Sequence, residues 1–65
     1  MLPTPAMIKQ TRNEAGLTQT EAAKLVSSDI RTWQYWESGQ IKMHSAKWEV
    51  FLIKTRFLEK TKDTK

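Results

Sequence analysis

Residues 16–39 read GLTQTEAAKLVSSDIRTWQYWESG and carry the signals of two short helices. Thr18 and Glu21 form a capping box, because the hydroxyl and the carboxylate each accept a hydrogen bond from the other residue's backbone amide. A helix is therefore expected from this box to about Val26. Its apolar side consists of small residues, which let a neighbouring helix approach closely: Ala22, Ala23 and Val26.

The polar run Ser27, Ser28 and Asp29 interrupts this pattern. Such side chains compete for backbone amides and favour turns and helix starts. We expect a tight turn there and a further helix over residues 30–38, which Gly39 ends. Two short helices joined by a tight turn form the framework of a helix-turn-helix unit.

The expected helix over residues 30–38 has two contrasting faces. At about 100° per residue, Trp33 and Trp36 fall on one side, where they suit packing against small residues. The other side carries hydrogen-bonding side chains: Arg31, Gln34, Tyr35 and Ser38. Arginine bonds guanine and glutamine bonds adenine through two hydrogen bonds each. This side is either a surface that reads bases in the DNA major groove or the solvated face of an ordinary amphipathic helix.

The segment before this unit predicts another helix. Thr4 followed by Pro5 is typical of an N-cap with proline in the first helical position. This helix is expected to run to about Ala15, where Gly16 ends it. Together with a helix near the C-terminus, the chain is predicted to be all-α, a single four-helix domain over residues 1–60.

The last helix is expected from Ser45, its N-cap, to about Leu58 or Lys60, before a frayed polar tail at residues 61–65. It is apolar on two sides. One side suits the core of the domain: Trp48, Phe51, Leu52 and Leu58. The opposite side has no partner within so short a chain, so we expect a two-fold dimer interface that contains Val50, Ile53 and Phe57.

Size, charge and composition narrow the function. The chain has 65 residues, no cysteine and one histidine, His44, so neither a disulfide nor a metal site is expected, and no cofactor is predicted. Domains this small often gain stability by self-association. The 11 Lys and Arg residues against 7 Asp and Glu give a net charge of +4, which suits a polyanionic partner. No set of nucleophile, base and orienting group is recognisable, so an enzyme is not expected.

Neither a membrane span nor secretion is indicated. No apolar run approaches the ~20 residues that cross a bilayer. Residues 1–6 lack the basic and apolar regions of a signal peptide. We therefore expect a cytoplasmic protein.

The stretch from Arg12 to Gly39 resembles, without a gap, the lambda-repressor and Cro-like (XRE-type) helix-turn-helix family. The matching residues are GLTQ at 16–19, Glu21, Ala23 and the run from Thr32 to Gly39. The run from Arg31 to Gly39 looks like small phage-encoded regulators, including those that accompany anti-CRISPR genes. The family implies a DNA-binding domain whose third helix enters the major groove. It usually has a fifth helix, for which this chain has no room beyond Leu58.

The resemblance also implies residue roles. Base contacts correspond to Ile30, Arg31, Gln34 and Tyr35. Contacts to the DNA backbone are expected from Thr18, Gln19, Ser38, Lys42 and His44, although a neutral, solvated side chain is an equal alternative for His44. Arg12 and Glu37 match an internal ion pair. Ser27 and Ser28 replace the glycine and the apolar residue that many members have at the turn, so Ile30 either faces DNA or turns inward to supply the missing apolar contact.

The predicted function is that of a dimeric transcriptional repressor that binds an inverted repeat in double-stranded DNA and represses its own phage operon. A two-fold dimer places the two reading helices about 34–36 Å apart, one turn of DNA. Two alternatives remain. One is a regulator that binds RNA, whose deep, narrow major groove resists a helix. The other is a protein-interaction module, such as an antitoxin or an inhibitor of a host factor, that uses the exposed apolar stripe.

Overall fold

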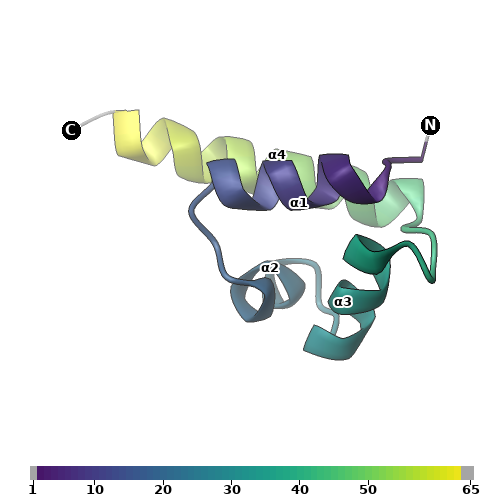
Figure 1. Ribbon diagram of the computed structural model, residues 1–65. Coiled ribbons are helices and arrows are strands. Elements are labelled where there is room, and N and C mark those ends of the chain that lie inside the picture. Colours follow the sequence, from purple (N-terminus) through teal and green to yellow (C-terminus); the bar gives the residue numbers. More distant parts are fainter. Residues whose placement is uncertain (1, 64–65) are drawn as a thin grey trace.

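The computed structural model describes residues 2–63, and of residues 57–63 it describes the backbone alone. This part of the chain is all-helical, as predicted. Its four helices are α1 (Pro5–Glu14), α2 (Gln19–Leu25), α3 (Ile30–Ser38) and α4 (Ser45–Asp63). In Figure 1, α2 and α3 lie on one side of the molecule and α1 and α4 on the other.

Local capping signals account for the first two helices. Thr4 caps α1 by accepting a hydrogen bond from the backbone N–H of Met7 at 3.1 Å, with proline in the first turn. Gly16 follows α1 with a φ of 74°, a left-handed conformation that glycine adopts without strain. The capping box of α2 is complete, since Thr18 and Glu21 each accept from the other's backbone amide.

The turn between α2 and α3 contains a residue in an unfavourable conformation. Ser27 has a φ of 58°, which non-glycine residues rarely adopt. Asp29 then caps α3 by accepting from the backbone N–H of Thr32 at 2.9 Å. Hydrogen bonding to Thr32, first from its side chain and then from its backbone N–H, lowers the pKa of Asp29 below its ordinary value. Gly39 ends α3 with a φ of 86°.

Aromatic side chains from α3 and α4 form the centre of the core. Trp33 packs edge-on against Phe51, with ring centroids 4.9 Å apart and planes at 61°. The two rings are fully buried, and Ile8 of α1 and Met43 of the loop before α4 complete the centre. Each helix therefore contributes to one core, with α2 supplying the alanines that lie against α3.

The last helix differs from the prediction at both ends. Ser45 is its first residue and does not cap it, because the carbonyl of His44 already accepts the hydrogen bond from the backbone N–H of Trp48 at 3.0 Å. The helix continues past Lys60 to Asp63, so the backbone of most of the expected tail is helical. Residues 64–65 lie outside the described part.

Over the described residues, none of the helices combines the length and the apolar character that crossing a bilayer requires.

Candidate nucleic-acid interface

The two faces of α3 lie as its sequence pattern predicts. Trp33 and Trp36 are buried and pack edge-on against each other, with ring centroids 5.5 Å apart. Arg31 and Gln34 are exposed, and Tyr35 is half-buried. The helix is therefore anchored by its indoles and presents hydrogen-bonding side chains to solvent.

Small residues on α2 make room for these indoles. Ala22 and Ala23 are completely buried in the same cluster as Trp33. α2 and α3 have the most extensive contact of any pair of helices in the described chain. A larger side chain at either alanine would separate the two helices, because a closely packed core has no spare volume for added atoms.

The carboxylate of Glu37 joins α1 to α3. Its Oε2 accepts from Nε of Arg12 at 2.6 Å, and its Oε1 lies 3.3 Å from Nη2 of the same guanidinium. The side chains of Arg12 and Glu37 are only 12% and 7% exposed. The indole N–H of Trp33 donates to the same carboxylate, and Nη1 of Arg12 donates to the carbonyl of Leu17 at 2.9 Å. The ion pair that the family resemblance implies is therefore present, and further hydrogen bonds surround it.

These bonds keep Glu37 charged. Burial raises the pKa of its carboxyl group, but hydrogen bonds from Arg12, Trp33 and Gln19 lower it by more. The pKa of Glu37 consequently lies below its ordinary value. An ionised carboxylate only accepts hydrogen bonds, so it determines the orientation of every group that bonds to it.

Gln19 connects this ion pair to the outer face of α3. Its Nε2 donates to Oε1 of Glu37 at 3.1 Å, which directs its own carbonyl oxygen away from the carboxylate. That oxygen accepts from Nε2 of Gln34 at 3.4 Å. Among the described residues, the carbonyl oxygen and the second N–H of Gln34 have no hydrogen-bond partner. These are the acceptor and the donor that a glutamine presents to the edge of adenine.

Of the other predicted DNA contacts, some are hydrogen-bonded within the domain and others are exposed. The hydroxyl of Thr18 accepts from Glu21 within the capping box, and that of Ser38 donates to the carbonyl of Tyr35 at 3.1 Å. Ile30 is 36% exposed, so it does not turn inward to replace an apolar contact at the turn. Lys42 and His44 are exposed in the loop between α3 and α4.

Two lysines of α4 bind the end of α2, which the sequence analysis did not predict. Nζ of Lys54 donates to the carbonyl of Leu25 at 2.9 Å, and Nζ of Lys47 donates to the carbonyl of Val26. Carbonyls at a helix C-terminus lack partners within their helix and carry partial negative charge, which favours ammonium groups. The spacing of seven residues places both lysines on one face of α4, but nothing in the sequence identifies their partner.

The two apolar sides of α4 differ in exposure. Trp48 and Phe51 are buried in the core, whereas Val50 and Ile53 are 39% and 67% exposed. The C-terminal part of α4 extends beyond the other helices in Figure 1. Phe57, the third residue of the predicted dimer interface, lies outside the residues whose side chains are described.

Comparison with known curated proteins gives a short, partial similarity. No family model matches the chain. A stretch of 42 residues, 65% of the chain, is 40% identical to part of the Type II methyltransferase M.MspI of a Moraxella species. The chain spans about a tenth of the length of that enzyme, because the match covers 10% of it.

Proposed function

We propose that this chain is a sequence-specific regulator that binds double-stranded DNA, with α3 in the major groove, as XRE-type helix-turn-helix proteins do. One observation carries the proposal. The indoles of Trp33 and Trp36 fix α3 from behind, while Gln34 points outward with a free donor and a free acceptor. Direct readout of base edges requires polar side chains that have unused donors and acceptors and that are held on a rigid support. The outer face of α3 and its buried indoles meet these two requirements.

The side chains of this face match the chemistry of base pairs. Gln34 presents the groups that bond N6 and N7 of adenine, and Arg31 has the fork geometry that bonds O6 and N7 of guanine. Tyr35 and Ile30 offer apolar surface for a thymine methyl group. Gln19, held by Glu37 at the start of α2, lies beside Gln34 and is the proposed contact to the DNA backbone.

We propose no enzymatic activity. Three carboxylates of the described chain have structural roles: Glu21 in the capping box, Asp29 at the start of α3 and Glu37 with Arg12. The methyltransferase shares only a short stretch with this chain, so its activity is not transferred.

The apolar side of α4 supports a homodimer that acts as a repressor. Val50 and Ile53 present apolar surface that a second copy covers in a two-fold interface. Such a dimer sets two copies of α3 about 34–36 Å apart, which matches the half-sites of an inverted repeat. Binding such an operator in the cytoplasm excludes polymerase from the promoter, and autorepression of a phage or mobile-element operon is the proposed role.

Selection of bound sequences from a random duplex pool tests this proposal with the whole chain. We expect an inverted repeat whose half-sites are one helical turn apart. Arg31→Ala should lose discrimination at one position of each half-site, a cost of about 1–3 kcal/mol. Arg56→Ala, an exposed arginine of α4, is the matched control and should select the same motif.

The same selection, run without and then with an RNA hairpin as competitor, separates the alternatives. A protein-interaction module is favoured by the exposure of Ile53, and it would enrich no duplex sequence at all. An RNA-binding regulator would lose its duplex DNA to a competing RNA hairpin. Either result overturns the proposed function.

A further inference from the structure

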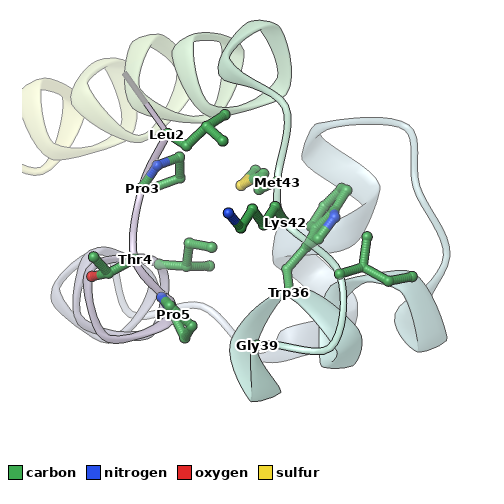
Figure 2. A pocket seen from close by; sticks show the side chains of 10 residues that line it. Leu2, Pro3, Thr4, Pro5, Trp36, Gly39, Lys42 and Met43 are labelled. Atoms are coloured by element: carbon green, nitrogen blue, oxygen red, sulfur yellow. The ribbon is translucent and has the colours of Figure 1, made fainter.

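An apolar cavity lies on the N-terminal side of α1. It is formed between the segment at residues 2–5 and the loop that joins α3 to α4, and its volume is about 290 Å³ (Figure 2). A water molecule occupies about 30 Å³ in the liquid. The cavity therefore has room for a ligand of about ten non-hydrogen atoms.

Apolar side chains line the floor and the rim of this cavity. The floor consists of buried parts of the core: Ile8, Trp36 and Met43. At the rim, Leu2 and Ile41 are 46% and 47% exposed, so large aliphatic side chains face water there. A hydrocarbon group in the cavity would remove this surface from water, which is the main driving force for binding in apolar pockets.

A single charged side chain lines the cavity. Lys42 is that residue, and Figure 2 shows its ammonium group directed toward the N-terminal segment, between Thr4 and Met43. Among the described residues no carboxylate forms a salt bridge with it. An anionic group at the rim would be complementary in charge, whereas a cationic group would be repelled.

We propose that this cavity binds a small apolar carboxylate, with its hydrocarbon part against Trp36 and Met43 and its carboxylate beside Lys42. The combination of an apolar floor and one lysine at the rim carries the assignment. Trp36 and Gly39 belong to α3 and its C-cap, so an occupant contacts the helix that is proposed to read DNA. Binding itself requires no DNA, so failure of this proposal and failure of the proposed function are distinguishable.

Titration of the whole chain with octanoate, followed by NMR, tests the site. Octanol is the matched probe, because it keeps the hydrocarbon chain and lacks the charge. We expect saturable shifts at the indole N–H of Trp36 and at the methyl groups of Ile8 and Met43. Octanoate should bind about two- to five-fold more tightly than octanol, the contribution typical of an ion pair at a partly exposed site.

Substitution of the lysine separates charge from apolar contact. Lys42→Gln should weaken the binding of octanoate about two- to five-fold and leave the binding of octanol unchanged. Lys9→Gln, an exposed lysine of α1 that does not line the cavity, should change neither. The proposal is overturned if octanoate gives no saturable shifts in the lining residues, if the shifts fall on Val50 and Ile53, or if octanoate binds no better than octanol.

Discussion

The side-chain amide of Gln34 donates to that of Gln19 at 3.4 Å, and Gln19 in turn donates to Glu37 at 3.1 Å. This chain of bonds begins at the buried ion pair with Arg12 and ends at the exposed face of α3. The acceptor-only carboxylate thus determines how the outermost amide is oriented. Orientation of Gln34 is therefore a property of the folded domain before any ligand arrives.

Gln34→Ala tests whether this amide reads a base. We expect a loss of about 1–3 kcal/mol in binding to the selected operator, confined to one position of each half-site. Gln19→Ala should weaken binding to every sequence, because it removes the proposed contact to the DNA backbone as well as the support of Gln34. Titrations at one fixed salt concentration measure both. Gln10→Ala, on α1, is the control, and equal affinity of Gln34→Ala for all operator variants would contradict the assignment.

The charge of Glu37 makes stability depend on pH. Burial raises the pKa of this group, but its hydrogen bonds lower it by more, so the folded-state pKa lies below the ordinary value of 4.5. A lowered pKa stabilises the fold above pH 4.5, and this contribution is lost as the pH falls through the folded-state pKa. We expect the free energy of unfolding, measured with urea, to decrease below pH 4.5.

Glu37→Gln should be less stable at pH 7 and show a weaker decrease in acid. A residual decrease is expected from Asp29, whose pKa is also lowered in the folded state. An acid dependence equal to that of the unmodified chain would show that the charge of Glu37 contributes nothing to folding.

Helix positions were predictable because their signals are local. Asp29 and Gly39 bracket α3 within the residues that the sequence indicates, and the spacing of Trp33 and Trp36 alone identifies its buried face. The ends of α4 differ from the prediction: the carbonyl of His44 accepts the first hydrogen bond of the helix, a position expected for Ser45, and the helix continues past Lys60 to Asp63.

The contacts between distant segments were not predictable in the same way. In the sequence, Lys47 and Lys54 are indistinguishable from ordinary surface lysines. Their bonds to the end of α2 are evident only from the packing of α4 beside it. The cavity near Lys42 depends on how the N-terminal segment lies against the loop after α3. Both features depend on tertiary packing, which helical periodicity does not encode.

Ser27→Gly should stabilise the domain. Ser27 has a φ of 58°, and a left-handed conformation costs a residue with a Cβ atom about 1–2 kcal/mol. Glycine removes this strain, although it adds about 0.5–1 kcal/mol of unfolded-state entropy. We expect a net gain of up to about 1 kcal/mol in urea denaturation. Ser28→Gly, next to it and without a positive φ, should be destabilising, and a gain of equal size there would refute the explanation.

The lysines that bind the end of α2 should contribute to stability in proportion to their burial. Lys47→Met leaves the carbonyl of Val26 without its charged donor at a half-buried position, for which we expect about 1–2 kcal/mol. Lys54→Met, at an exposed position, should cost less. Lys9→Met is the control and should fall within about 0.5 kcal/mol. Thermal unfolding compares the three variants. Identical midpoints would show that the bonds from the lysines to the end of α2 do not stabilise the fold.

The exposed apolar side of α4 gives the last prediction. Ile53 is 67% exposed, so Ile53→Glu should leave the fold intact, as circular dichroism can verify. In the proposed two-fold dimer each Ile53 lies in the shared interface, where two added carboxylates would repel each other without partners. Light scattering should then show that Ile53→Glu is monomeric. The variant should also bind the operator more weakly. Met7→Glu adds the same charge at an exposed residue of α1 and should stay dimeric; an Ile53→Glu dimer would exclude this face as the interface.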